Sequence, residues 1–116
     1  MKEYGRTIPY KIKIADSFTK RLKGLMFRKD PLVEEGLWIT PCNSIHMCFM
    51  HFPIDAVFIN QTGRIVTMVE DLKPWKFVKP IKEAHSVVEL PAGTIKKLSL
   101  KQGESINLSK EKAVLS

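Results

Sequence analysis

The chain has 116 residues, 44% of them hydrophobic, and its 19 lysines and arginines outnumber its 12 acidic residues to give a formal charge of +7. This size allows one hydrophobic core, so we expect a single domain over residues 1–116. No run of about 18 apolar residues is present, which argues against membrane insertion, and the first residues lack an apolar signal stretch. Two cysteines are too few for the disulfide framework of a small secreted protein, so we expect a cytoplasmic location and reduced thiols.

The basic residues are spread along the chain, as is typical of a solubilising surface. We therefore do not expect a nucleic-acid partner, because such sites combine clustered charge with aromatic side chains that stack on bases. The segment 73–80 around Trp75 is the one place that fits this description. A polyanion-binding module that uses Arg21, Arg28, Trp75 and Lys76 thus remains an alternative function.

The N-terminal residues predict a strand followed by a helix. Residues 7–15 alternate apolar with mostly polar side chains, the period of a strand with one solvated face. Asp16 or Ser17 can then cap a helix that extends to about Phe27, before Asp30-Pro31 disfavours helical backbone. We expect this amphipathic helix to pack on a sheet through a narrow apolar face. That face comprises Phe18, Leu22, Leu25 and Met26.

The rest of the chain has the rhythm of a β protein, with short segments of branched and aromatic residues separated by turn residues. Residues 60–63 should form the turn of an antiparallel hairpin, with Gly63 supplying a positive φ. The pattern favours a mainly β, single-domain fold with one amphipathic helix. The expected strands are 36–40, 44–51, 54–59, 64–69, 85–90 and 105–108, with a loop at 71–80 and a short helical turn at 94–100.

Three sequence blocks carry a family resemblance. They run from Arg21 to Arg28 (Arg-Leu-Lys-Gly-Leu-Met-Phe-Arg), from His46 to Phe58 around Phe-Pro-Ile-Asp, and from Val88 to Gly93 (Val-Glu-Leu-Pro-Ala-Gly). With all three in this order, the chain resembles the domain of unknown function 192 family from end to end. The resemblance implies a β-barrel or jelly-roll-like sandwich with one helix laid across it, and it implies no established reaction.

Two departures from the family pattern indicate which subgroup of the family the chain resembles. Many relatives read Trp-Met-Lys-Asn-Thr where this chain has His46 to His51, and many carry an export signal that is not seen here. The Pro-Cys-Asn-Ser-Ile-His version, from Pro41 to His46, resembles a cytoplasmic subgroup. The resemblance suggests a pilus-assembly context for some members of that subgroup and says nothing about mechanism.

Cys42, His46, Cys48 and His51 are the ligand types of a tetrahedral zinc site. On an extended strand, however, His51 points to the opposite face from the other three, so convergence would need a bulge. Structural zinc sites also bring ligands in pairs from two turns, and a second pair is missing. We therefore expect no metal or other cofactor, and the cysteines are best explained as small buried residues.

An enzyme is the alternative class of function. A thiol beside His46 or His51 could form an activated nucleophile. A hydrolase or metal-assisted enzyme would then use His46, Cys48 and Asp55. Because a catalytic cysteine usually lies on an exposed elbow rather than in an apolar strand, we favour a non-catalytic protein.

Asp55 is an acid at the start of an otherwise apolar strand, where an unpaired charge would be costly. We expect it to accept backbone N–H groups or to pair with Arg21 or Arg28, and as an alternative to form the polar floor of a ligand cleft. The leading hypothesis is a small binding or accessory module for an unknown small molecule or protein, with a cleft near residues 38–55. The candidate ligand-binding residues are Arg28, Trp38, His46, Met50 and Asp55, with Phe52 as a further wall.

Overall fold

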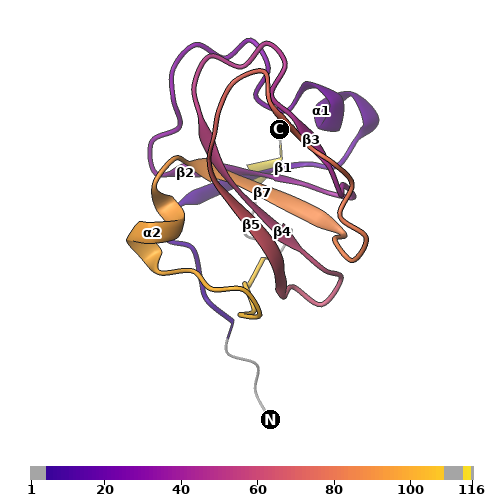
Figure 1. Ribbon diagram of the computed structural model, residues 1–116, viewed down its shortest axis with the longest axis vertical. Coiled ribbons are helices and arrows are strands. Elements are labelled where there is room, and N and C mark those ends of the chain that lie inside the picture. The colour runs from indigo at the N-terminus through magenta and orange to yellow at the C-terminus, as the bar shows by residue number, and fades with distance from the viewer. Residues whose placement is uncertain (1–4, 109–113, 116) are drawn as a thin grey trace.

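The computed structural model describes residues 5–108 and 114–115 and is mainly β. Six strands form one sheet in the order β5-β4-β7-β2-β1-β8, and β3 and β6 form a separate two-stranded ribbon. Figure 1 shows the two short helices, α1 and α2, at opposite corners of the molecule. In chain order the elements are β1 (Lys11–Ala15), α1 (Phe18–Lys23), β2 (Glu35–Ile39), β3 (Ile45–His46), β4 (Ile54–Ile59), β5 (Ile65–Leu72), β6 (Phe77–Val78), β7 (Ser86–Pro91), α2 (Thr94–Leu98) and β8 (Val114–Leu115).

The sheet is mixed, which the strand patterns do not reveal. β1 pairs in parallel with β2 on one side and β8 on the other, whereas the β2–β7, β7–β4 and β4–β5 pairs are antiparallel. The strands of the described residues do not close into a barrel, so the expected barrel or jelly roll is not confirmed. The mainly β class itself is confirmed.

The predicted hairpin is present, with β4 and β5 antiparallel. The Asn60 side chain accepts hydrogen bonds from the backbone N–H groups of Thr62 and Arg64, both at 3.0 Å. Gly63 has φ +90°, a conformation that a side chain would strain, as expected from the turn sequence. The short helical turn near residue 94 is also present, as α2.

Three predicted segments differ from the structure. Only Ile45–His46 of the expected strand 44–51 is extended, because the chain turns immediately afterwards and Met50 donates its backbone N–H to Met47 at 3.2 Å. The expected loop 71–80 instead contains the end of β5 and all of β6. The expected strand 105–108 makes only single bridges, from Ser105 to Arg64 and from Ile106 to Arg6.

The expected docking of the first helix is wrong. α1 has six residues, and none of them is buried. Phe18 is 71% exposed and Leu22 58% exposed, whereas Leu25 is buried just beyond the helix end. Gly24, with φ +50°, ends the helix and donates its N–H to the Lys20 carbonyl at 2.9 Å, so the chain turns before a long apolar face can form.

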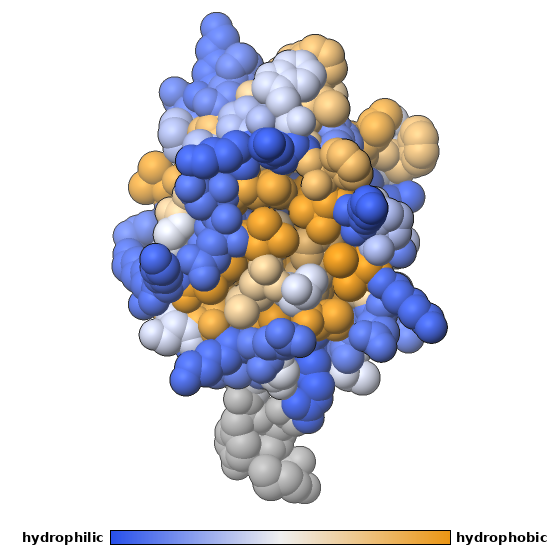
Figure 2. Space-filling model, in the orientation of Figure 1, coloured by the Kyte–Doolittle hydropathy of each residue, from blue (hydrophilic) through white to orange (hydrophobic). Residues whose placement is uncertain are grey.

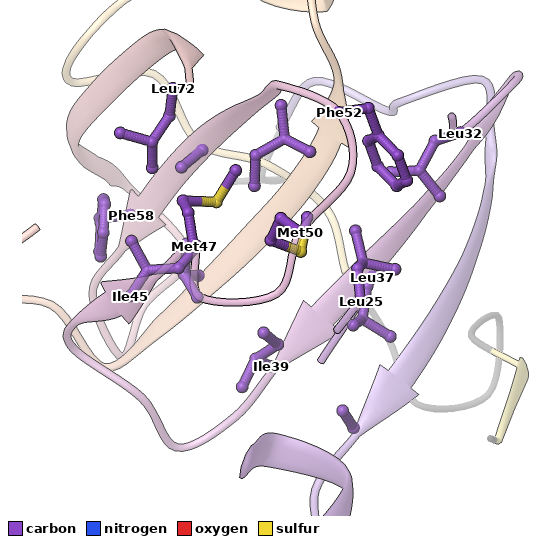
Figure 3. Packing of buried hydrophobic residues seen from close by; sticks show 14 residues of the cluster. Leu25, Leu32, Leu37, Ile39, Ile45, Met47, Met50, Phe52, Phe58 and Leu72 are labelled. Carbon is purple, nitrogen blue, oxygen red and sulfur yellow. The ribbon is translucent and has the colours of Figure 1, made fainter. Parts of the chain in front are cut away.

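The core has two parts, one on each face of the large sheet. Alternate residues of β7 enter different clusters: Val87 belongs to the larger cluster, and Val88 and Leu90 to the smaller. Figure 3 shows the larger cluster, with Met47 and Met50 near its centre and Leu25 beside Leu37. Viewed from outside, apolar side chains gather at the centre of one face of the molecule inside a hydrophilic rim (Figure 2).

Candidate functional site

Glu89 is a carboxylic acid in the middle of the sheet. On β7 it stands opposite Leu37 of β2 and Ala56 of β4, both members of the larger apolar cluster. Because side chains alternate along a strand and Val88 and Leu90 enter the smaller cluster, the Glu89 carboxyl is directed into the larger one. A strongly hydrophilic side chain therefore lies where the fold otherwise places only apolar groups.

The Glu89 carboxyl is incompletely satisfied. The residue is 3% exposed, and its Oε1 atom has no hydrogen-bond partner. Burial raises the pKa of Glu89 to about 8, because the charged form loses its hydration. At neutral pH the group is thus mainly the neutral acid, which can donate one O–H as well as accept hydrogen bonds.

Glu89 is one of the residues that line a small pocket. It has a volume of about 40 Å³ and lies between α1 with the turn after it, the segment from the end of β2 through β3, and β7. We call it the Glu89 pocket. Leu25, Ile39, Ile45 and Met50 give it apolar walls, and its polar lining residues are Arg21, Lys23, Cys42, Ser44, His46 and Glu89.

The rim of the Glu89 pocket is basic. Lys23 and His46 are exposed and Arg21 is half-exposed, in contrast to the buried Glu89. Ser17 caps α1 by accepting the Lys20 N–H at 3.3 Å, and the Arg21 guanidinium donates to the Asp16 carbonyl at 3.1 Å. These contacts fix the short helix, so that Arg21 and Lys23 line the opening.

The two cysteines are free and half-buried, and so are not the fully buried residues that were expected. The Cys42 thiol donates to the Ser44 carbonyl at 2.9 Å, and burial raises the pKa of Cys42. A neutral thiol is a poor nucleophile, so the site does not favour thiolate chemistry. His46 accepts the Cys48 backbone N–H at Nδ1, at 3.2 Å. Within residues 5–108 and 114–115, no three His, Cys, Asp or Glu side chains are close enough together to hold a metal ion.

Asp55 lies in the core and organises the backbone around it. It is fully buried and accepts N–H groups from Asp71 at 2.9 Å, Gly93 at 3.1 Å and Ile95 at 2.8 Å. This is the first of its two expected structural roles, and it ties β4 to the end of β5 and to the start of α2. The arginines do not serve it: Arg28 pairs with Glu35 and donates to the Asp30 carbonyl, and Arg21 donates to Asp16.

The structure brings together two of the five candidate ligand-binding residues. His46 and Met50 both line the Glu89 pocket. Trp38 donates from Nε1 to the Ser86 hydroxyl at 2.9 Å and packs against the smaller cluster, whereas Arg28 borders a different depression near Lys13. Phe52, the further wall, is buried in the larger cluster.

Sequence analysis missed Glu89, although a signal was available. The residue is the only charged one among residues 86–90, where its neighbours are Ser86, two valines and a leucine. It also belongs to the Val88 to Gly93 block. A single carboxylate in the centre of a strand buried on both faces needs a hydrogen-bond partner or a functional reason, as does Asp55 at the start of such a strand.

A second surface carries exposed aromatic rings. Phe27 stacks on Phe49 with ring centroids 5.1 Å apart, and Phe49 meets Trp75 edge-on at 5.0 Å. All three have positive φ, between 62° and 70°, and they come from three different loops. Backbone hydrogen bonds hold those loops together, from Phe27 to Phe49 at 3.0 Å and from Trp75 to Met47 at 2.8 Å. We call Phe27, Phe49 and Trp75 the aromatic row.

The fold and the pocket define a small β protein with a buried acidic group beneath a basic opening. Comparison with known proteins places it in a family: the DUF192 model (Uncharacterized ACR) matches residues 1–108, and the chain belongs to that family. A UPF0127 protein of Pyrococcus furiosus is 36% identical over 107 residues, covering 88% of this chain and 90% of the relative. A UPF0127 protein of Thermococcus kodakarensis is 35% identical over 120 residues, covering 95% and 74%.

Two solved structures resemble the fold. A Sinorhizobium meliloti protein, described as a candidate transcription regulator, has a TM-score of 0.73 and 27% identity, covering 81% of this chain and 78% of that one. A protein of unknown function from Novosphingobium aromaticivorans has a TM-score of 0.72 and 23% identity, covering 83% and 73%. Of the two helices in the described residues, neither is long and apolar enough to cross a membrane.

Proposed function

We propose that this protein is a small binding module without a catalytic role, and that its ligand enters the Glu89 pocket. The observation that carries this proposal is that Glu89 lines the pocket and that its buried Oε1 has no hydrogen-bond partner. A buried polar group without a partner costs free energy, and an apolar residue there would avoid that cost. A glutamate that lowers the stability of the fold is expected where function requires it, and here the function would be a hydrogen bond to a ligand.

The surroundings support binding rather than reaction. The pocket combines apolar walls with a few convergent polar groups, which is the usual make-up of a small-molecule site. It coincides with the expected cleft near residues 38–55 through Ile39, Cys42, Ser44, His46 and Met50. The thiol in the pocket, that of Cys42, has a pKa raised by burial and donates a hydrogen bond to a carbonyl, so it is not activated as a nucleophile.

The proposal is tested by titrating the isotope-labelled protein with three small probes, namely acetate, acetamide and methylammonium, while amide signals are followed by NMR. We expect at least one probe to shift the signals of Gly24, Cys42 and His46 in the parent protein. The shifts should vanish in Glu89→Leu and persist in Glu83→Gln, a matched change at an exposed glutamate. If no probe shifts these signals, or if Glu89→Leu responds like the parent, the pocket is not the binding site.

The aromatic row supports a second candidate function, the binding of a polyanion. Trp75 is 62% exposed, and in the sequence it follows Lys73 by two residues and directly precedes Lys76. Phe77, the next residue, is 67% exposed. Exposed rings beside lysines can stack on bases while the ammonium groups neutralise phosphates. The description of the Sinorhizobium protein as a candidate transcription regulator is in line with this alternative.

Salt dependence tests the second candidate. The logarithm of the binding constant for a single-stranded oligonucleotide should fall linearly with the logarithm of the salt concentration, with a slope of about −0.7 for each neutralised phosphate. Trp75→Ala and Lys76→Ala should weaken binding, whereas Lys96→Ala, on the exposed face of α2, should not. Equal effects of Lys76→Ala and Lys96→Ala would indicate general attraction to the net charge and would exclude a site at the aromatic row.

A further inference from the structure

We infer that the ligand of the Glu89 pocket is a small anion that presents a carboxylate group, which accepts a hydrogen bond from the Glu89 carboxyl. This inference rests on the proposed function and adds the chemical class of the ligand. Three features of the pocket lead to it, namely the charge of its rim, the protonation of its floor and its size.

The charge of the rim selects against cations. Every ionisable group that lines the pocket, apart from Glu89 and the Cys42 thiol, is basic: Arg21 and Lys23 from α1 and His46 from β3. The residues opposite Glu89 on β2 and β4 are Leu37 and Ala56, which carry no charge. A positive rim around an apolar opening attracts anions and repels an ammonium or guanidinium ligand.

The floor of the pocket offers a donor rather than a second negative charge. Burial raises the pKa of Glu89 to about 8, so at pH 7 most molecules hold a carboxylic acid there. Its O–H can donate to a carboxylate oxygen, and hydrogen bonds of the O–H···O⁻ type are short and strong. A bound anion in turn favours the neutral form of Glu89, because two adjacent carboxylates cannot both be charged without strong repulsion.

The size of the pocket limits the group that enters. A volume of about 40 Å³ accepts only a few non-hydrogen atoms, since a single water molecule needs about 10–15 Å³ of cavity volume measured in this way. Leu25, Ile39 and Met50 would contact the carbon next to the carboxylate. A longer ligand would extend outward past Leu22, which is 58% exposed and also lines the pocket.

The test compares two probes of similar size and opposite charge, sodium acetate and methylammonium chloride, at constant ionic strength and pH 6.5. Acetate should shift the NMR amide signals of Gly24, Cys42 and His46, and methylammonium should not. Glu89→Gln keeps an N–H donor and should retain acetate binding, whereas Glu89→Leu should lose it. The spectrum of each variant also shows whether it is folded, and Glu83→Gln serves as the unaffected control.

The pH profile separates the role of the Glu89 proton from simple attraction to the rim. In the parent protein the affinity for acetate should fall about tenfold per pH unit above pH 8, as Glu89 loses its proton. In Glu89→Gln, which has no proton to lose at this position, the affinity should not show this fall above pH 8. A parallel fall in both proteins would overturn the assigned role of Glu89.

The other outcomes distinguish failure of the inference from failure of the proposed function. Methylammonium binding at the pocket without acetate binding overturns the carboxylate inference and leaves the proposed function standing. Failure of both of these probes and of acetamide to shift the pocket signals overturns the inference and the proposed function together. Acetate shifts that persist in Glu89→Leu show an adventitious ion only, held at the basic rim, and also overturn the inference.

Discussion

Glu89 should make the stability of the protein depend on pH. Below its unfolded pKa of 4.5 the group is protonated in both states and its contribution is fully present. Between pH 4.5 and about 8 the unfolded chain releases the proton and the folded protein keeps it, so stability falls by up to about 1.4 kcal/mol per pH unit. Above about pH 8 both states are charged, and this loss stops.

The measurement is the free energy of unfolding in urea for the parent and Glu89→Gln between pH 5 and 9. The difference between the two proteins isolates Glu89, because the other titrating groups are common to both. We expect the parent to lose stability relative to the variant as pH rises to about 8. Curves that run parallel across this range would show that Glu89 titrates normally in the folded protein.

Asp55 should be needed for stability because it satisfies three backbone donors in the core. Asp55→Asn keeps the shape but replaces one acceptor oxygen by an N–H₂ group that faces those donors. We expect a loss of about 1.5–3 kcal/mol in denaturant unfolding. Asp71→Asn, which alters an exposed surface pair with Lys73, should change stability by less than about 0.5 kcal/mol. Equal effects of the two substitutions would mean that the charge of Asp55 contributes little.

At the scale of elements, the first helix should contribute little packing and the turn after it much more. Leu22 on α1 is 58% exposed, whereas Leu25, after Gly24, is 8% exposed and packs in the larger cluster. Leu25→Ala should therefore cost about 2–5 kcal/mol by leaving a cavity, and Leu22→Ala less than about 0.5 kcal/mol. Thermal or urea unfolding of both variants checks this. A larger loss for Leu22→Ala would mean that α1 is docked on the sheet after all.

For the whole molecule, we predict that the purified protein carries no stoichiometric metal. The Cys42 thiol donates a hydrogen bond to the Ser44 carbonyl, and His46 accepts one from the Cys48 backbone N–H. His51 is exposed beyond the turn. These side chains do not converge as the ligands of a structural zinc site must. Elemental analysis should find well under one zinc per chain. Near one equivalent, lost together with folding upon chelation, would contradict the prediction.

The candidate site was only half visible in the sequence. His46 and Met50 were predicted in a cleft near residues 38–55 and line the Glu89 pocket, but Asp55, Trp38 and Arg28 lie elsewhere. The expected strand 44–51 ends at His46 because Met47 to Met50 form a turn, so the strand alternation that set His51 apart from Cys42, His46 and Cys48 does not apply. The floor of the pocket comes from Glu89, 43 positions beyond His46 in the sequence.

The sequence by itself determined what depends on neighbouring residues. The alternation before Ala15, the Ser17 cap, the hairpin at Gly63 and the helical turn near Thr94 all follow from local backbone preferences. The acid in an apolar strand also indicated that Asp55 must find either backbone donors or an arginine, and the structure shows backbone donors. The three sequence blocks were sufficient to indicate the family.

Only the tertiary structure decided which segments meet. The parallel pairing of β1 with β2, the exposure of α1 and the burial of Glu89 depend on strands and loops far apart in the chain. An apolar pattern predicts that one face of an element is buried, but it does not predict which part of the protein covers that face. Phe18 and Leu22 have the right spacing for a buried face and remain exposed, while Glu89 has the wrong chemistry for a core and is buried. Both results arise because packing is set by the whole sheet, whereas sequence periodicity reports only on the element to which a residue belongs.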